Sequence, residues 1–159
     1  MRIGNGYDAH RLKQGRPMIL CGVELPSDFG PDGHSDADVA LHALCDALLG
    51  ALALGDIGLH FPDSDERYKG ANSRELLAQV YALVRENGHV IENADITIVL
   101  QSPKLRPYIL QMRECVSSTL DCELNQISIK ATTEEHMGFT GSGEGIAAYA
   151  AVLLKNNQE

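Results

Sequence analysis

The feature that constrains the fold most is an apolar run from Val39 to Leu54, which contains only two polar side chains, His42 and Asp46. At about 16 residues the run is shorter than the ~20 residues that a helix needs to cross a bilayer. Its apolar residues fall on nearly all faces of a helix, which is typical of a helix covered on every side. The run therefore predicts a buried helix of a globular protein that begins at Ser35 and ends before Gly55.

The start of this helix is predicted from the residues before the run. Ser35 is a favourable N-cap, and Asp38 follows three residues later, as in a capping box with an acid shorter than the usual Glu. Carboxylates in a first helical turn are favoured by the helix dipole and by free N–H groups. We therefore interpret Asp36 and Asp38 as helix-start carboxylates rather than as metal ligands.

Strands and helices alternate along the rest of the chain, whose 159 residues are 44% apolar, enough for one domain over 1–159. The alternation, with a strand-rich end, indicates an α/β sandwich in which helices cover one side of a sheet. The expected elements are a strand at 2–10 that becomes irregular at Gly4 and Gly6, a short hairpin or bulged strand at 18–25, a loop at 26–33, a helix capped by Asn72 or Ser73 and ended by Gly88, a helix at 107–120, and strands at 94–101, 126–133 and 146–154.

The charge of the chain bears on its ligands and partners. The formal net charge is −9 and no run of Lys or Arg is present, which argues against a nucleic-acid partner. The same acidity opposes an anionic substrate unless a metal or local donors offset it. No signal-like segment precedes Arg2, and the four cysteines include no Cys-x-x-Cys pair. We therefore expect reduced thiols and a cytoplasmic, non-membrane protein.

Three residues are candidate zinc ligands. Asp8 and His10 are two apart on a strand, so their side chains point to the same face. Taken alone, the pair is better explained by a hydrogen bond between the two side chains, and His42 by a core histidine with a backbone partner. Together the three would leave a fourth coordination position open, which is the pattern of a catalytic zinc site.

Several polar loops are further candidates. Asp56, His60, Asp63 and Asp65 lie in one loop, where they either stabilise turns or hold a ribose hydroxyl or Mg²⁺. The segment 132–135 follows a strand end and could bind phosphate, with one Glu as a metal ligand, although a plain polar loop is the simpler interpretation. The side chain of Lys104 could face an anion. The glycine-rich segment 141–145 is interpreted as a turn. No P-loop or dinucleotide fingerprint is present.

Five stretches together resemble the 2-C-methyl-D-erythritol 2,4-cyclodiphosphate synthase family: RIGNGYDAH (2–10), HSDADVALHALCDALLGALALGDIG (34–58), FPDSD (61–65), KGANSRELL (69–77) and KATTEEHMGFTGSGEGIA (130–147). The resemblance runs from Arg2 to about Leu154. It implies a homotrimer with active sites shared between subunits, each subunit having a mixed four-stranded sheet. It also implies conversion of 4-diphosphocytidyl-2-C-methyl-D-erythritol 2-phosphate into the cyclic diphosphate, with release of CMP.

The resemblance also implies roles for individual residues. Asp8, His10 and His42 would bind Zn²⁺, and Glu135 would hold Mg²⁺ or Mn²⁺ together with substrate phosphates. His34 and Thr133 would act in catalysis. The implied substrate contacts around the methylerythritol are Ser35, Asp56, Ile57, Gly58, Phe61, Pro62, Asp63, Ser64 and Asp65. Those around the cytidine and its phosphates come from a neighbouring subunit and are Leu100, Gln101, Ser102, Pro103, Lys104, Leu105, Arg106, Ala131 and Thr132. Two further implied contacts are Phe139 and Ser142.

Two positions depart from the family pattern. Ser142 stands where many relatives have Arg near the three-fold axis, so binding of isoprenoid diphosphates in that cavity is not expected. Glu134 stands where Thr is usual, and a second carboxylate beside Glu135 is a candidate to alter metal preference. A zinc-dependent phosphatase or nucleotide hydrolase that uses a metal-bound water would fit the same ligands. A non-catalytic trimeric metal-binding protein is a third hypothesis, and the open coordination position argues against it.

Overall fold

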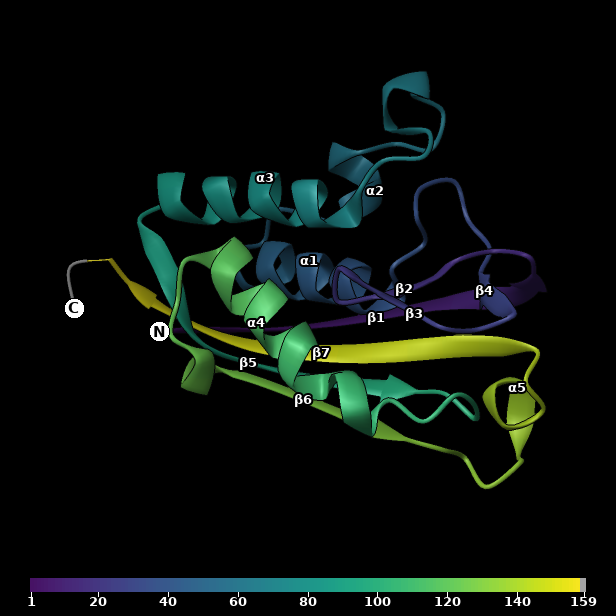
Figure 1. The fold of residues 1–159 in the computed structure, drawn as a ribbon. Coiled ribbons are helices and arrows are strands. Elements are labelled where there is room, and N and C mark those ends of the chain that lie inside the picture. Colours follow the sequence, from purple (N-terminus) through teal and green to yellow (C-terminus); the bar gives the residue numbers. More distant parts are fainter. Residues whose placement is uncertain (158–159) are drawn as a thin grey trace.

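The computed structural model describes residues 1–157; the last two residues of the predicted 1–159 domain lie outside this range. Figure 1 shows a sheet with its helices gathered on one side. The elements are β1 (Arg2–Gln14), β2 (Met18–Leu20), β3 (Val23–Leu25), β4 (Phe29–Pro31), α1 (Val39–Ala51), α2 (Ile57–His60), η1 (Glu66–Tyr68), α3 (Ser73–Glu86), β5 (His89–Val99), η2 (Arg106–Tyr108), α4 (Ile109–Leu120), η3 (Leu124–Gln126), β6 (Ile127–Thr132), α5 (Gly138–Gly141) and β7 (Gly145–Asn156).

The main sheet is mixed and has the strand order β4-β1-β7-β5-β6. Its β5–β6 pair is parallel, and the other pairs are antiparallel. The α/β architecture with helices on one side is confirmed, but the sheet has five strands rather than the four expected. The extra strand, β4, lies in the segment predicted as a loop, because β1 continues to Gln14 and its last three residues pair with Phe29–Pro31.

Helix α1 lies in the middle of the molecule, between the sheet and α3 (Figure 1). It packs on β1 and β7 below and on α3 above, while the β2–β3 hairpin and α4 contribute to the same core. This position explains why its sequence is apolar on all faces, as predicted. Within residues 1–157, no helix has the length and apolar character required to traverse a bilayer.

The glycines of β1 do not make the strand irregular, contrary to the sequence prediction. The strand pairs with β7 without interruption from Arg2 to Arg11. Gly4 and Gly6 instead face α1, where an added Cβ would lie 1.9 Å from the carbonyl oxygen of Ala47 and 2.0 Å from that of Ala43, respectively. The glycines therefore let the backbone of α1 approach the strand far more closely than any side chain would allow.

Helix α1 begins at Val39 and is capped by Asp38, not by Ser35 as predicted. Ala37 has a φ of 56°, a left-handed conformation that a right-handed helix cannot include. Asp38 is fully buried, and its carboxylate accepts hydrogen bonds from the backbone N–H groups of Leu41, Cys21 and Gly22. Burial raises the pKa of this carboxyl to about 6, although the N–H donors oppose the shift. Asp38 thus joins the β2–β3 hairpin to the start of α1.

Most other predicted elements are present with small shifts of their ends. The segment 18–25 forms a two-stranded hairpin, and Asn72 caps α3 by accepting a hydrogen bond from the N–H of Arg74. The loops predicted after Gly55 and around 138–141 contain the short helices α2, η1 and α5. These short helices were missed because a single turn leaves no apolar period to detect.

Candidate metal centre and substrate cavity

Asp8, His10 and His42 form a compact cluster between β1 and α1. The Oδ2 atom of Asp8 lies 2.9 Å from Nε2 of His10 and 3.1 Å from Nδ1 of His42. The two ring nitrogens are 3.4 Å apart. The structure therefore brings together the three residues predicted as zinc ligands. Asp8 and His10 lie on the same face of β1, and His42 lies on α1, which the glycines of β1 allow to approach the strand closely.

The cluster fits a zinc ion in its dimensions and in its donors. Nitrogen and oxygen ligands about 2.0–2.2 Å from a tetrahedral zinc lie roughly 3.3–3.6 Å from one another. The separation of the two ring nitrogens, 3.4 Å, already lies in this range, and the two distances from Asp8, 2.9 and 3.1 Å, need to widen by only a few tenths of an ångström. Three protein ligands leave one coordination position for another group, as in catalytic zinc sites.

The electrostatics of the cluster favour cation binding. Burial alone would raise the pKa of Asp8, but hydrogen bonds to His10 and His42, and their charge, lower it to about 2. Burial alone would lower the pKa of His10, but the hydrogen bond and charge of Asp8 outweigh this effect and raise it. Asp8 is therefore ionised at neutral pH, whereas a proton competes with a metal for His10.

Each imidazole is oriented by a second hydrogen bond. Nδ1 of His10 lies 3.0 Å from the carbonyl oxygen of Asp32 and donates to it, which directs Nε2 toward the cluster. Nε2 of His42 faces two hydroxyls, that of Ser73 at 2.9 Å and that of Ser35 at 3.2 Å. Both rings therefore present their other nitrogen to the common point between the three residues.

A cavity of about 260 Å³ opens beside the cluster. Within residues 1–157, the buried Nε2 atom of His34 has no hydrogen-bond partner, so this ring offers a polar group to a ligand of the cavity. The predicted site residues that line the cavity are Asp8, His10, His34, Ser35, His42, Ile57, Gly58, Phe61 and Asp63.

Sequence reasoning missed several cavity residues, of which Asp46 is the most polar. It lies four residues after His42 on α1, and its carboxylate accepts a hydrogen bond of 2.7 Å from the N–H of Ile57. Burial raises the pKa of Asp46, although the Ile57 N–H opposes the shift. A polar residue one helical turn from His42 in an apolar helix was an available signal. The other missed lining residues are Gly33, Tyr68 and Leu76.

Two of the loop acids predicted as substrate contacts are also helix caps. Asp56 caps α2 by accepting a 2.8 Å hydrogen bond from the N–H of Leu59, and it lines a different pocket. Asp65 caps η1 and is paired with the side chain of Arg67 at 2.6 Å. The turn interpretation therefore accounts for both carboxylates. Pro62, Ser64 and Asp65 are not among the residues that line the metal-side cavity.

His60 has a structural partner. Its Nε2 lies 2.9 Å from the carbonyl oxygen of Leu54 and donates to it. This bond ties α2 back to the segment that follows α1, and His60 does not line the cavity.

A second pocket of about 320 Å³ gathers the residues predicted to hold the nucleotide. It lies where the adjacent parallel strands β5 and β6 end, as expected for a ligand site at the carboxyl ends of parallel strands. It shares no lining residue with the cavity beside the metal cluster. Its lining residues are Leu100, Gln101, Pro103, Lys104, Leu105, Arg106, Ala131, Thr132 and Thr133.

Glu134 and Glu135 follow this pocket in a tight loop. Glu135 has a φ of 52°, and its N–H donates to the hydroxyl of Thr133 at 3.4 Å. Glu134, considered above as a candidate to alter metal preference, accepts a hydrogen bond from the hydroxyl of Thr140 and so links the loop to α5. Glu135 is exposed and lines none of the pockets described here.

The three remaining predicted contacts, Ser102, Phe139 and Ser142, lie in segments that follow the carboxyl ends of β5 and β6. Ser102 and Ser142 line a pocket of about 620 Å³ that also includes His136. Phe139 lines one of about 250 Å³ beside Arg11. The structure of the single chain thus distributes the predicted substrate contacts over several pockets.

Known sequences match this chain over nearly its whole length. The YgbB family profile matches residues 1–155. The 2-C-methyl-D-erythritol 2,4-cyclodiphosphate synthase of Geobacter metallireducens is 58% identical over 98% of this chain and 99% of its own length. That of Geobacillus kaustophilus is 56% identical over 98% of this chain and 99% of its own.

Solved structures share the same fold. The bifunctional IspDF from Campylobacter jejuni superposes with a TM-score of 0.94 at 46% identity, over 98% of this chain and 42% of that one. A CDP-bound 2C-methyl-D-erythritol-2,4-cyclodiphosphate synthase gives a TM-score of 0.90 at 40% identity, over 97% of this chain and all of the other. A CDP complex of IspF from Plasmodium falciparum gives 0.86 at 32% identity, over 98% and 96% of the two chains.

Proposed function

Since the chain belongs to the YgbB family and is a cyclodiphosphate-forming enzyme of isoprenoid biosynthesis, we propose how its own residues carry out that reaction. The substrate is 4-diphosphocytidyl-2-C-methyl-D-erythritol 2-phosphate, and the products are 2-C-methyl-D-erythritol 2,4-cyclodiphosphate and CMP. The observation that carries the proposal is the cluster of Asp8, His10 and His42 at the wall of a cavity.

The reaction needs no protein nucleophile. An oxygen of the substrate's 2-phosphate forms a bond to the β-phosphorus, and the bond from that phosphorus to the bridging oxygen breaks, so that CMP leaves with the electron pair. The protein must hold the two phosphates in line and exclude competing water. Asp8, His10 and His42 would hold Zn²⁺, which when bound polarises the diphosphate.

His34 and Ser35 are proposed to position the methylerythritol phosphate. Both line the cavity, and the buried Nε2 of His34 is available to a substrate oxygen. Ile57, Gly58, Phe61 and Asp63 also line this cavity.

The nucleotide half of the substrate is proposed to bind in the pocket that contains Lys104 and Arg106. Thr133 lies at its edge, where its hydroxyl would contact the phosphate during transfer. Glu135 is proposed to hold Mg²⁺ or Mn²⁺ together with substrate phosphate oxygens, which are the hard oxygen donors that these ions prefer. The two CDP complexes with this fold support a cytidine nucleotide ligand.

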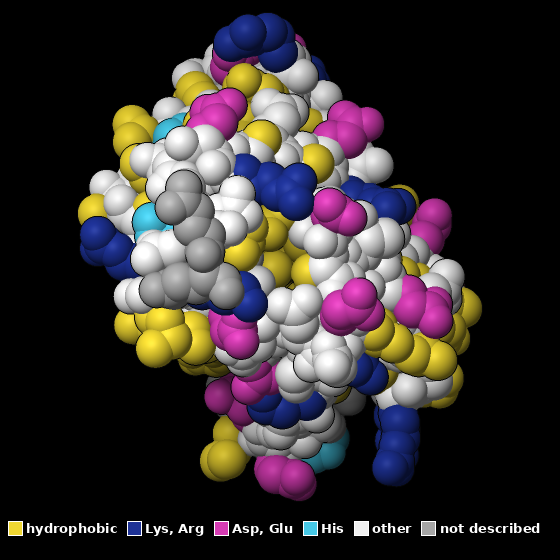
Figure 2. Space-filling model, turned by 90° about the vertical axis from the view of Figure 1, so that its left-hand side faces the viewer, with side chains coloured by type: hydrophobic (Ala, Val, Ile, Leu, Met, Phe, Trp, Pro, Cys, Tyr) yellow, Lys and Arg dark blue, Asp and Glu magenta, His cyan; other side chains and the backbone are white. Residues whose placement is uncertain are grey.

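Two divalent ions would reconcile an acidic protein with a polyanionic substrate. The chain has a formal charge of −9. On the face shown in Figure 2, Lys and Arg side chains are interspersed with Asp and Glu rather than gathered into a basic patch. Divalent ions bound at the site would therefore neutralise the phosphates of the substrate, in place of a positively charged protein surface.

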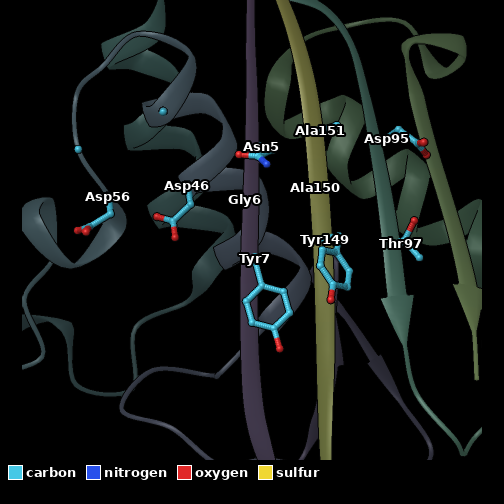
Figure 3. A pocket seen from close by; sticks show the side chains of 12 residues that line it. Asn5, Gly6, Tyr7, Asp46, Asp56, Asp95, Thr97, Tyr149, Ala150 and Ala151 are labelled. Atoms are coloured by element: carbon cyan, nitrogen blue, oxygen red, sulfur yellow. The ribbon is translucent and has the colours of Figure 1, made fainter. Parts of the chain in front are cut away.

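We propose that the two halves of each site meet between subunits of a homotrimer. The metal-side cavity and the nucleotide pocket share no lining residue. The sheet face opposite the helices exposes aromatic and apolar side chains, including Ile3, Tyr7 and Tyr149, whose exposed fractions are 79%, 48% and 54%. Figure 3 shows Tyr7 and Tyr149 side by side on β1 and β7, in a pocket of about 540 Å³. An exposed apolar face of this kind supports association.

The four cysteines support the proposed cytoplasmic location. All four are free thiols in the structure, and Cys21 and Cys45 are buried. Burial raises the pKa of both buried thiols well above the ordinary value, so they behave as structural apolar groups.

The proposed reaction is tested by incubating the zinc-loaded protein with the cytidyl substrate and Mg²⁺ and following ³¹P NMR. We expect the substrate signals to be replaced by those of CMP and of a cyclic diphosphate. Linear phosphate products would identify a zinc-dependent hydrolase instead, and the absence of CMP formation would contradict an enzyme acting on this substrate. A sample without divalent ions is the control.

The shared site is tested by mixing two inactive variants. In trimers assembled from equal amounts of His42→Ala and Lys104→Ala subunits, about one quarter of the sites combine an intact metal half with an intact nucleotide half. We expect about a quarter of wild-type activity to return. A mixture of His42→Ala with Asp8→Ala subunits, which share the damaged half, should stay inactive. No recovery in the first mixture would show that each subunit holds its own complete site.

A further inference from the structure

A chain of hydrogen bonds runs from the metal cluster to a carboxylate outside it. Nε2 of His42 lies 2.9 Å from the hydroxyl of Ser73, and that hydroxyl donates to Oδ1 of Asp36. The three residues come from α1, from the first position of α3 and from the loop before α1. Neither Ser73 nor Asp36 is among the residues assigned above to the metal or to the substrate.

The hydrogen bonds of this chain have one consistent direction. If His42 binds a metal through Nδ1, its Nε2 carries the proton and must donate. Ser73 accepts this bond with its oxygen, and its own proton goes to Asp36. The carboxylate therefore fixes the ring in the state with a lone pair on Nδ1, which is the atom that faces Asp8 and His10.

Asp36 is held firmly in this position. Its Oδ2 accepts a hydrogen bond of 2.9 Å from the backbone N–H of Ser73, and its Oδ1 accepts one of 3.1 Å from that of Asp38. Its own N–H donates to the carbonyl oxygen of Ala71 at 3.1 Å. Ser73 is fully buried. The hydrogen-bonded chain from His42 through Ser73 to Asp36, the relay, is therefore fixed by the fold and is not a contact between mobile surface groups.

We propose that Ser73 and Asp36 are positioning residues for the metal site and act on it through His42. The inference rests on the proposed zinc site. Hydrogen bonds from a ligating histidine to such partners orient the ring and increase its basicity, and their loss typically weakens metal binding about 10–100-fold. Since Ser73 is the first residue of α3, the relay also couples the metal affinity to the placement of that helix.

The hydroxyl of Ser35 is the competing partner of the same nitrogen. It lies farther from Nε2 of His42, at 3.2 Å, and already accepts the N–H of Ala37 at 3.1 Å. No carboxylate in the described part of the chain accepts a hydrogen bond from it. Its orienting effect on the ring should therefore be smaller than that of Ser73.

The proposal is tested by measuring zinc affinity in competition with a chromophoric chelator, without substrate. Ser73→Ala and Asp36→Asn should each weaken zinc binding about 10–100-fold. Because Ser73 and Asp36 act through one relay, the zinc affinity of the double variant should be no lower than that of the single variant with the lower affinity. Cobalt-loaded protein should show shifted visible absorption bands in both variants. Ser117→Ala removes another buried hydroxyl, one that donates within α4, and should change neither property.

Three outcomes separate the possibilities. Wild-type zinc affinity in Ser73→Ala or Asp36→Asn, with unchanged cobalt bands, would overturn the relay. Effects that multiply in the double variant would also overturn it, since they would show two independent contributions. If His42→Ala itself binds zinc as well as the wild type, the proposed metal site fails and the relay fails with it. Thermal unfolding of each variant confirms that the folded protein is being compared.

Discussion

Replacing His42 with Ala is expected to abolish zinc binding and to reduce turnover by at least about 1,000-fold, while the protein stays folded. The change removes one of three protein ligands, and two ligands do not hold a catalytic zinc. Metal polarisation of a phosphoryl group contributes several kcal/mol, and each 1.36 kcal/mol is tenfold in rate. The His42 side chain is still 13% exposed at the cavity wall, so its removal leaves the apolar contacts of α1 in place.

The matched control for this variant is His89→Ala. His89 lies at the start of β5, and Nδ1 of its ring donates a local hydrogen bond of 2.8 Å to the carbonyl oxygen of Asn87. Zinc content measured by metal analysis, circular dichroism and CMP release should all be unchanged in the control. Substantial zinc and activity in His42→Ala would refute the ligand role of His42 and with it the proposed centre.

Replacing Gly6 with Ala is expected to destabilise the fold by about 3 kcal/mol, the upper end of the usual cost of overpacking. The new Cβ would lie 2.0 Å from the carbonyl oxygen of Ala43 and 2.8 Å from the nitrogen of Ala47. These are backbone atoms of α1, so relief requires the helix to move away from β1. Since Asp8 follows Gly6 on the same face of β1 and His42 precedes Ala43, the same movement would separate the metal ligands.

Gly50→Ala provides the matched control, because it adds the same methyl group to α1 at a position with space. The nearest heavy atom to its new Cβ would be the carbonyl oxygen of Asn5, at 3.8 Å, an ordinary contact. Removing a glycine from a helix should raise stability by up to about 1 kcal/mol. Urea denaturation of the two variants gives both values. Equal stability of Gly6→Ala and the wild type would show that the strand and helix are not held in this close contact.

The alternation of apolar and polar residues predicted the main strands and helices, and the buried environment of α1 followed from its uniform apolarity. The caps were less predictable. Ser35 and Asp38 are both good N-caps by residue type, and the choice between them depended on the left-handed backbone at Ala37. The short strand β4 was missed because three residues give no period, and it forms only because the end of β1 lies beside it.

The candidate metal ligands were predictable, but the hydrogen-bond partners of His42 were not. Asp8 and His10 share a face by strand geometry alone, and His42 stands out in an apolar helix. From the sequence, Ser73 was predicted only as one of two candidate helix caps. Its contact with His42 joins residues 31 positions apart, and its contact with Asp36 joins residues 37 apart. Local sequence patterns cannot reveal such contacts.

By itself, the sequence determined the fold class through the alternation of strands and helices and the family through five matching stretches. It also determined three candidate zinc ligands, through residue type and strand geometry. The tertiary structure decided how close α1 lies to β1 and which hydroxyl and carboxylate form hydrogen bonds behind His42. It also decided that the cavity beside Asp8, His10 and His42 shares no lining residue with the pocket around Lys104. These features depend on how distant segments pack, since hydrogen bonds form only where packing brings donor and acceptor within about 3 Å.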